Sequence, residues 1–401
     1  MDHIIYKGIK YQVKAGELDL RSQGIRKVAE LQGLETLTNL KKLNLSKNKI
    51  EEIKGLSSLI NLQELHIGFN SLTELKGLEN LTKLQILIID HESEDYSTTN
   101  KGGIEEIKGL ETLTNLHTLE ISHNRITQIK GLEKLKNLRN LNLFSNSISE
   151  ITNLEKCTKL RSLNLGGNKI TEIKGLEMLG EIEELSLSNN NLTEIKGLEN
   201  LKNLRVLNLV WNKIPKIERK AMEILASFKN FQELTIYGND IKEIENLDNL
   251  TNLTTLNLDA NKITEIKGLE NLRNLEKLYL GTNKITKITG LANLKNLKIL
   301  GLGYNKIKKI KGLEKLINLK KLFLGENQIS EIKGLESNIN LEILNLRGNK
   351  ITEIKGLGKL TNLKEFYIHD NQIAEKTINQ LGGYSPKRYV KFPQKFVEYC
   401  Q

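Results

Sequence analysis

Cysteine is almost absent from this sequence, since only Cys157 and Cys400 occur among 401 residues. Two thiols are too few for a disulfide scaffold, which favours a reducing compartment. The sequence also lacks an unbroken apolar run of membrane-helix length, and its first residues, MDHIIYKGIK, contain no apolar core of signal-peptide length. We therefore expect a cytoplasmic protein with no membrane segment.

Catalytic motifs are missing as well. The chain contains no GxGxxG or GxxxxGK[ST] phosphate loop, no nucleophile elbow, and no paired carboxylates outside its repeats. We expect no enzymatic activity, no cofactor and no metal site. Basic residues outnumber acidic ones by 60 to 49, giving a net charge of +11, but they are interleaved with glutamate along the chain. A solvated surface is favoured over a nucleic-acid or membrane site.

What the sequence has instead is one segment repeated along most of its length. LTNLKKLNLSKNKIEEIKGL begins at Leu37, and its Asn48 recurs at steps of 22 residues. Asn70 and Asn124 are two steps plus ten residues apart. Asn212 and Asn239 are one step plus five residues apart. With Gln23 in the asparagine slot of a degenerate first repeat and LQILIID as a further strand, we count sixteen repeats. The asparagines are Asn48, Asn70, Asn124, Asn146, Asn168, Asn190, Asn212, Asn239, Asn261, Asn283, Asn305, Asn327, Asn349 and Asn371.

Each repeat predicts one strand and one return segment. In LxL the leucines point to one side and the intervening residues to the other. The return segment is too short for a long helix, so we expect 3₁₀ or turn structure there. Stacked repeats predict an α/β solenoid, an arc of about sixteen strands with a parallel sheet on its concave side. The asparagines are predicted to be structural, bonding backbone groups of their own turn and of the neighbouring turn.

The ends of the array differ from its repeats. We predict an N-terminal β-hairpin cap at 1–17, the array at 18–374 with insertions near 90–103 and 215–231, and a C-terminal cap at 375–401. Helical spacing of apolar residues in the second insertion predicts an amphipathic helix. Five aromatic residues of the C-terminal cap are expected to cover the last repeat, namely Tyr384, Tyr389, Phe392, Phe396 and Tyr399.

The pattern LxxLxxLxLxxNxIxxIxGLxxLxxL resembles the leucine-rich repeat of the 22-residue class. It is most similar to the regulatory subunit of type-1 protein phosphatase and, second, to the internalins. The resemblance covers about residues 18–374 and implies a horseshoe-like fold and a binding function. It suggests a signalling protein as partner, such as a phosphatase or a small GTPase, which in that family is engaged by aromatic and acidic residues of the concave face.

The residues that vary between repeats are the candidates for function. Aromatic side chains gather on repeats nine to fourteen, with glycines between them and two acidic residues beside them. Clustered exposed aromatics are typical of partner-binding surfaces, although aromatics on adjacent strands also stack on one another for stability. The predicted partner-binding residues are Trp211, Tyr237, Asp259, Tyr279, Tyr304, Phe323 and Glu326.

We therefore predict a monomeric, non-catalytic scaffold that grips one globular protein on its concave face. The alternative is a nucleic-acid or ribonucleoprotein-associated module, using the basic excess and the basic-aromatic tail around Lys387 and Arg388. The acidic insertion at 90–103 is equally consistent with function and with surface decoration. His66, His91 and His123 fall on neighbouring repeats, but their spacing matches no zinc-binding motif.

Overall fold

The computed structural model describes residues 3–91 and 103–401, so most of the acidic insertion at 90–103 lies outside the described residues. Sixteen parallel strands, β3 to β18, follow one another in chain order. The predicted parallel solenoid is confirmed. The chain forms two compact units: an N-terminal unit (Met1–Leu192 and Lys196–Leu204) and a C-terminal unit (Thr193–Ile195 and Arg205–Gln401).

Every strand of the array has three residues. The strands of the N-terminal unit are β3 (Glu17–Asp19), β4 (Lys42–Asn44), β5 (Glu64–His66), β6 (Ile86–Ile88), β7 (Thr118–Glu120), β8 (Asn140–Asn142), β9 (Ser162–Asn164) and β10 (Glu184–Ser186). Those of the C-terminal unit are β11 (Val206–Asn208), β12 (Glu233–Thr235), β13 (Thr255–Asn257), β14 (Lys277–Tyr279), β15 (Ile299–Gly301), β16 (Lys321–Phe323), β17 (Ile343–Asn345) and β18 (Glu365–Tyr367).

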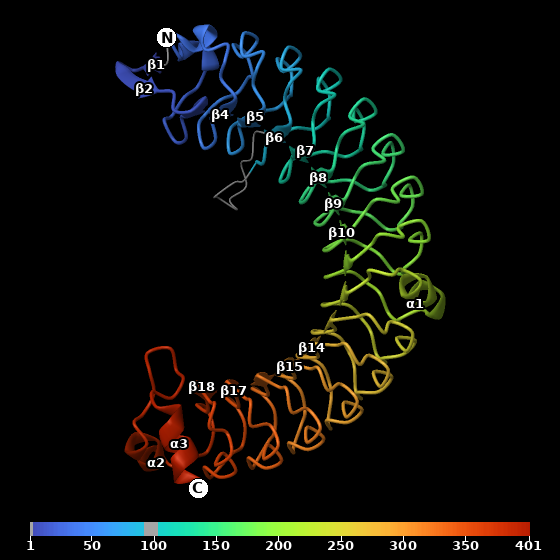
Figure 1. The fold of residues 1–401 in the computed structure, drawn as a ribbon, viewed down its shortest axis with the longest axis vertical. Coiled ribbons are helices and arrows are strands. Elements are labelled where there is room, and N and C mark those ends of the chain that lie inside the picture. Colours follow the sequence, from blue (N-terminus) through green and yellow to red (C-terminus); the bar gives the residue numbers. More distant parts are fainter. Residues whose placement is uncertain (1–2, 92–102) are drawn as a thin grey trace. The chain divides into compact units, whose positions relative to one another are not determined.

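The register of these strands keeps equivalent residues side by side. In the N-terminal unit Leu163 pairs with Leu185, and in the C-terminal unit Leu256 pairs with Leu278. These central leucines are buried, while the residues before and after them lie on the other face of the sheet and keep partial exposure. Within each unit the strands line one side and the return segments the other (Figure 1). The strand face therefore presents the residues that differ between repeats.

Each ladder asparagine fastens its own turn to the preceding one. The Asn283 Nδ2 group donates to the carbonyl oxygen of Leu280 in its own repeat (3.2 Å) and to that of Leu258 one repeat earlier (2.9 Å). Its Oδ1 accepts the backbone N–H of Ile263, also one repeat earlier (2.9 Å). The same geometry recurs along the ladder, for example at Asn168. One amide thus satisfies buried backbone groups that no strand partner reaches.

The return segments are tight turns, as the repeat length predicts. The only 3₁₀ helices among residues 3–91 and 103–401 are η1 (Val28–Glu30) and η2 (Leu34–Thr36). Glycine is required in the KGL turns, since Gly197 has φ +74° and a Cβ there would overlap the carbonyl oxygen of Ile173. The longer repeat after Asn212 contains α1 (Arg219–Ala226), the predicted amphipathic helix, with Met222 and Leu225 buried.

Non-repeat elements lie at both ends. Strands β1 (His3–Tyr6) and β2 (Ile9–Gln12) pair antiparallel around Lys7 and Gly8, both with positive φ, and Ile5 bridges to Gln32 in the array. At the other end lie helices α2 (Glu375–Gln380) and α3 (Pro393–Tyr399). The division into three domains at the predicted boundaries stays a prediction.

The C-terminal aromatic residues cover the last repeat only in part. Phe396 of α3 is fully buried, and its ring meets that of Phe366 in β18 edge to face at 5.7 Å. The expectation was wrong for Phe392 and Tyr399, which are 51% and 59% exposed. The seven-residue helix has one buried side, and only Phe396 and Val397 lie on it.

Removing a ladder asparagine should destabilise the array. Asn283→Ala is expected to lower the free energy of unfolding by about 1–3 kcal/mol, because buried backbone groups lose their partner. Urea denaturation followed by circular dichroism measures this. Asn274→Ala is the matched control, since its exposed side chain donates a single bond to the carbonyl of Thr251 (3.0 Å). Equal losses from both variants would contradict a special role for the ladder.

Truncating the buried cap residue should uncover the last repeat. Phe396→Ala is expected to cost about 3–5 kcal/mol of unfolding free energy, because a large buried ring is lost. Phe392→Ala removes the same ring from an exposed position and should cost less than about 1 kcal/mol. Thermal unfolding and chemical denaturation of the two variants would show the difference. A Phe392→Ala variant as unstable as Phe396→Ala would mean that the exposed ring also stabilises the packing of the cap on the last repeat.

Candidate functional site

The seven predicted binding residues all lie in the C-terminal unit, on or just after the strands β11 to β16. Tyr279 and Phe323 end β14 and β16, and the register places Gly301 between them. The other five follow their strands at the turn that leads to the ladder asparagine, namely Trp211, Tyr237, Asp259, Tyr304 and Glu326. We call these seven residues the aromatic face. The structure brings them to one side of the sheet.

Backbone conformation explains why some of them stand out from the surface. The residue before the ladder asparagine has positive φ in almost every repeat, and Trp211, Tyr304 and Glu326 occupy this slot with φ of 51°, 54° and 56°. The slot is part of the repeat turn, because Ser145 adopts the same conformation in another repeat. Side chains there point away from the core. Trp211 is 54% and Tyr304 53% exposed, a large apolar surface for a solvated position.

The aromatic rings are arranged in two ways. Trp211 meets Tyr237 edge to face, with ring centroids 5.2 Å apart, and its ring lies against Gly238. This pair fits the stacking alternative. Tyr279, Tyr304 and Phe323 form no ring–ring pair with any residue the structure describes, and the Tyr279 ring lies over Gly301. Glycine at 301 therefore leaves the rings of Tyr279 and Phe323 without a larger side chain between them.

A column of three glycines continues this opening. Gly281, Gly303 and Gly325 occupy the same slot on consecutive repeats, two residues before the ladder asparagines. Charged residues occupy this slot on either side of the glycines, with Asp259 before them and Arg347 after them. The Asp259 side chain lies against Gly281 and the Arg347 side chain against Gly325, and only Gly303 between them has no side chain of a described residue next to it. The face therefore combines aromatic rings with a charge of opposite sign at each end of the glycine column.

Asp259 is held in place by the neighbouring repeat. Its Oδ1 accepts the backbone N–H of Gly281 at 2.5 Å. Burial raises the pKa of the Asp259 carboxyl, and the hydrogen bond from Gly281 lowers it by less. A partly desolvated carboxylate of this kind attracts a cation from a partner.

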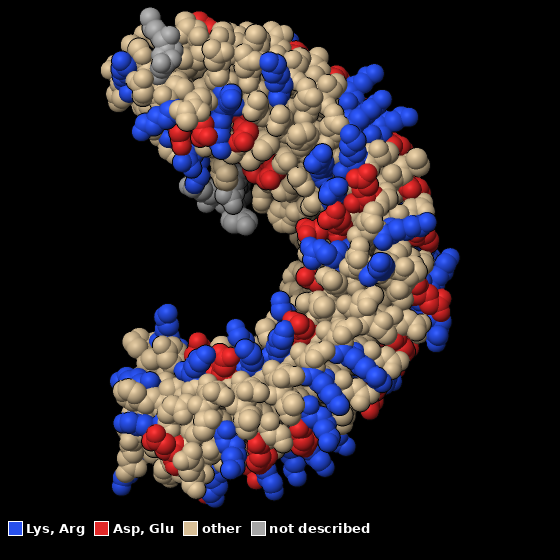
Figure 2. Space-filling view, in the orientation of Figure 1, with Lys and Arg blue, Asp and Glu red and all other residues tan. Residues whose placement is uncertain are grey.

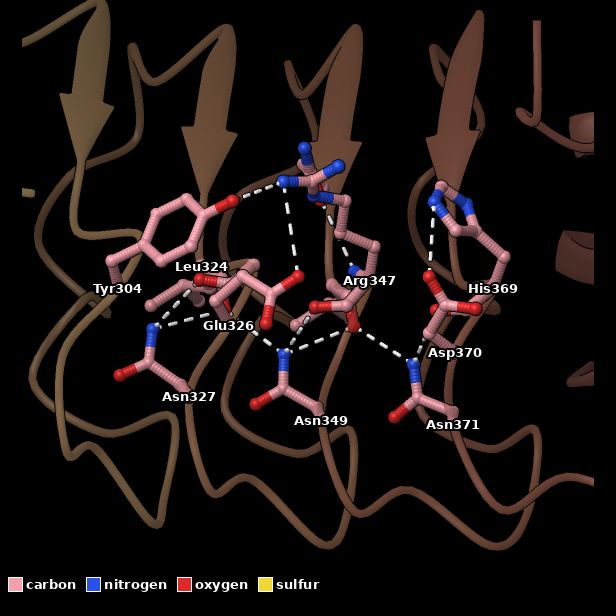
Figure 3. Close-up of polar contacts among 12 residues, drawn as sticks. Tyr304, Leu324, Glu326, Asn327, Arg347, Asn349, His369, Asp370 and Asn371 are labelled. Carbon is pink, nitrogen blue, oxygen red and sulfur yellow. Dashed lines mark hydrogen bonds and ion pairs between the residues drawn. The ribbon is translucent and has the colours of Figure 1, made fainter.

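Arg347 was not among the predicted binding residues, yet it contacts two of them. Its Nη2 donates to the Tyr304 hydroxyl oxygen at 2.5 Å and lies 3.7 Å from a Glu326 carboxylate oxygen. The guanidinium also lies over the Tyr304 ring, 5.8 Å from its centroid. Figure 3 shows the three side chains converging above the asparagine ladder. Arg347 shares the slot of Asp259, and it was left out of the predicted set because that set contains only aromatic and acidic residues.

Charge elsewhere is dispersed. Figure 2 shows basic and acidic side chains interspersed over the visible face of each unit. Lysines of the KGL turns pair with glutamates two positions earlier, as in Lys174 and Glu172 (3.7 Å). Such alternation offsets the field that a phosphate backbone would follow.

Leucine-rich repeat models match the chain at residues 136–178, 181–219, 229–271, 260–293, 295–337 and 339–382, and a second such model matches residues 36–52. The chain belongs to the leucine-rich repeat family. Proteins of this family commonly act as protein-interaction scaffolds. No curated protein is a significant match to the chain.

Solved leucine-rich repeat structures support this assignment. An internalin of Listeria monocytogenes is 30% identical, with a TM-score of 0.56 over 87% of this chain and 85% of the other. A leucine-rich repeat protein of Leptospira interrogans is 26% identical, with a TM-score of 0.79 over 96% and 94%. The ectodomain of an Arabidopsis thaliana membrane receptor kinase, solved with CASPARIAN STRIP INTEGRITY FACTOR 2, is 22% identical, with a TM-score of 0.54 over 84% and 45%, and shares the fold.

These matches bear on the resemblances seen in the sequence. The internalin resemblance is supported, whereas the resemblance to the phosphatase regulatory subunit stays a hypothesis. Within residues 3–91 and 103–401, no helix of this leucine-rich repeat protein is long and apolar enough to cross a membrane.

The histidines of the N-terminal unit have other contacts. The His66 Nε2 atom lies 3.7 Å from a carboxylate oxygen of Glu64. The His123 ring packs edge to face on the Phe144 ring, with ring centroids 5.3 Å apart. Burial lowers the pKa of both His66 and His91. Among the residues that the structure describes, no three His, Cys, Asp or Glu side chains lie close enough together to hold a metal ion.

Neutralising Asp259 should make stability less dependent on pH. A carboxyl whose pKa is higher in the folded state than in the unfolded state weakens folding as pH rises through the two pKa values. Asp259→Asn keeps the acceptor for Gly281 and removes the charge. It should therefore be more stable than wild type at pH 7, and the difference should vanish below the ordinary pKa of aspartate. Urea denaturation between pH 3 and pH 7 measures this.

The exposed Asp248 offers the matched control. Asp248→Asn should change stability little at any pH in this range. A loss of stability in Asp259→Asn at pH 7 would show that the charge itself is held favourably.

Proposed function

We propose that the protein is a non-catalytic scaffold that binds a globular protein partner through the aromatic face of its C-terminal unit. The observation that carries the proposal is the exposure of Trp211 and Tyr304, which are 54% and 53% exposed on the strand side of the C-terminal unit. Tryptophan and tyrosine at such positions supply most of the binding energy in many interfaces.

The geometry supports a partner surface with protruding side chains. The middle of the glycine column, at Gly303, is free of neighbouring side chains among the residues that the structure describes, and Tyr279 and Phe323 end the strands on either side of β15. Asp259 and Arg347 lie on either side of the glycines, so a partner with a basic group near the first and an acidic group near the second matches the charge pattern. A phosphatase or a small GTPase is the partner class that the repeat resemblance suggested, and it stays a prediction.

The two cysteines bear on the cellular compartment of the protein. Cys157 and Cys400 are free, which fits a reducing compartment. The same fold occurs in the ectodomain of a plant receptor kinase, so the fold does not fix the compartment. A cytoplasmic location and a monomeric state remain predictions.

A capture experiment with matched variants tests the proposal. Trp211→Ser and Tyr279→Asn take their replacements from the same slots in other repeats, where Ser145 and Asn257 stand. The double variant should fold as wild type does by circular dichroism and should lose, at least about tenfold, the protein that wild type captures from a lysate of its source cells. Quantitative mass spectrometry reads out the captured protein.

The control removes two exposed apolar residues from the return segments. Ile317 and Ile339 are 54% and 49% exposed, and Ile317→Thr/Ile339→Thr should leave capture unchanged. If both double variants capture the same proteins as wild type, the aromatic face does not bind the partner. Equal loss from both variants would indicate nonspecific adhesion to apolar surface.

A further inference from the structure

A cleft of about 320 Å³ lies at the end of the C-terminal unit, between the strand face of β15 to β18 and the C-terminal cap. It is lined by the sheet residues Tyr304, Phe323, Arg347 and His369 and by the cap residues Lys387 and Arg388, among others. Three of its lining residues are cationic and none is a carboxylate. Such a combination of positive charge and aromatic wall suits an anionic ligand.

The cap contributes a loop that is firmly built. Tyr384 and Val390 form an antiparallel bridge, the Ser385 N–H donates to the Tyr389 carbonyl (2.8 Å), and the Arg388 N–H donates to the Ser385 carbonyl (2.9 Å). Arg388 closes the turn with φ +63°. Lys387 and Arg388 therefore stand exposed at the tip of a closed hairpin-like loop.

The same loop is attached to the last strand. The Val390 N–H donates to the Phe366 carbonyl at 2.9 Å, and Tyr389 packs edge to face on Tyr367 with ring centroids 5.8 Å apart. Because these contacts fix the base of the loop, the backbone positions of its two cationic residues are set before any ligand arrives. Preorganised charge binds with less loss of conformational entropy than a free tail does.

The sheet supplies the third cation in a fixed orientation. Arg347 is held by the Tyr304 hydroxyl and by Glu326. Lys387 and Arg388, by contrast, have no carboxylate within 4.0 Å among the residues the structure describes. Two of the three cations thus have their charge available to a ligand.

His369 forms the part of the cleft wall next to the cap. This side chain lines the cleft and is nine-tenths buried, its exposed fraction being 9%. Its Nδ1 has no hydrogen-bond partner among the described residues, while its Nε2 lies 3.7 Å from Asp370. This nitrogen is itself closed off from solvent, so His369 forms part of the cleft wall and its Nδ1 offers no bond to a ligand there.

We propose that this cleft binds an extended acidic segment of a partner protein, with its Asp or Glu side chains between Arg347 and the Lys387–Arg388 loop tip. The proposal rests on the protein-binding function above and names the chemistry of the partner at this end of the face. A peptide fits better than a nucleic acid because the Arg347 guanidinium lies over one face of the Tyr304 ring, 5.8 Å from its centroid, so that this face does not receive a base. Base stacking needs free ring faces.

Fluorescence anisotropy tests this with three labelled probes. The first probe is a peptide of about ten residues rich in Asp and Glu, which is long enough to cross four strands. The second is the same peptide with Asn in place of Asp and Gln in place of Glu, and the third is an oligouridine of equal length. Wild type should bind the acidic peptide, and the neutral peptide should bind at least about fivefold more weakly, at low salt. Tighter binding of the oligouridine, or no preference for the acidic peptide, would overturn the proposal.

Charge-matched variants locate the binding. Lys387→Gln/Arg388→Asn should weaken binding of the acidic peptide at least about fivefold, and asparagine tolerates the positive φ of position 388. Lys391→Gln/Lys395→Gln removes the same charge from the cap outside the cleft and should change binding less than about twofold. Equal losses in both variants would mean nonspecific attraction and would overturn the proposal. Arg347→Gln, which leaves the loop intact, should also weaken binding.

The outcomes separate this proposal from the broader one. If the acidic peptide does not bind while Trp211→Ser/Tyr279→Asn still loses its captured partner, the cleft proposal fails and the proposed function stands. If the peptide binds as expected and capture is independent of the aromatic face, the cleft proposal stands alone.

Discussion

The hydrogen bonds of the asparagine ladder are the interaction on which the rest of the structure depends. Each three-residue strand is too short to satisfy the turn that follows it, and several backbone groups of that turn are buried. A single amide, such as that of Asn283, bonds the backbone of its own repeat and that of the repeat before it. Because every such bond links neighbours, the spacing and register of the repeats are set together, and the leucine core follows from them.

A scaffold that is fixed in this way leaves only certain positions free to differ. The slot before the ladder asparagine has positive φ because the turn demands it. Serine at 145 is half-buried there, whereas tryptophan at 211 is 54% exposed and is a binding candidate. Under the proposed function, the choice of side chains on this face determines what the protein binds.

The sequence was sufficient to predict the repeat array, because the 22-residue period gives both the position of each strand and the neighbours on which it stacks. The alternation in LxL and the 22-residue step predicted the strands, and the extra five residues before Asn239 predicted α1. The cap lacks that period, so the burial of Phe396 and the exposure of Phe392 depended on helix phase and tertiary contact. Likewise, the hydrogen bond from Arg347 to the Tyr304 hydroxyl joins residues in different slots, two repeats apart. The repeat pattern shows which residues share a slot, but it does not show which side chains of different slots come into contact.

The central claim is that a partner covers the aromatic face. Trp211 is the only tryptophan of the chain, so fluorotryptophan incorporation gives a single fluorine NMR signal from that face. Adding the purified partner should shift or broaden this signal and reduce its sensitivity to solvent exchange from H₂O to D₂O. An unchanged signal under conditions where the complex is formed, as judged by size-exclusion chromatography, would contradict the account and place the partner elsewhere on the molecule.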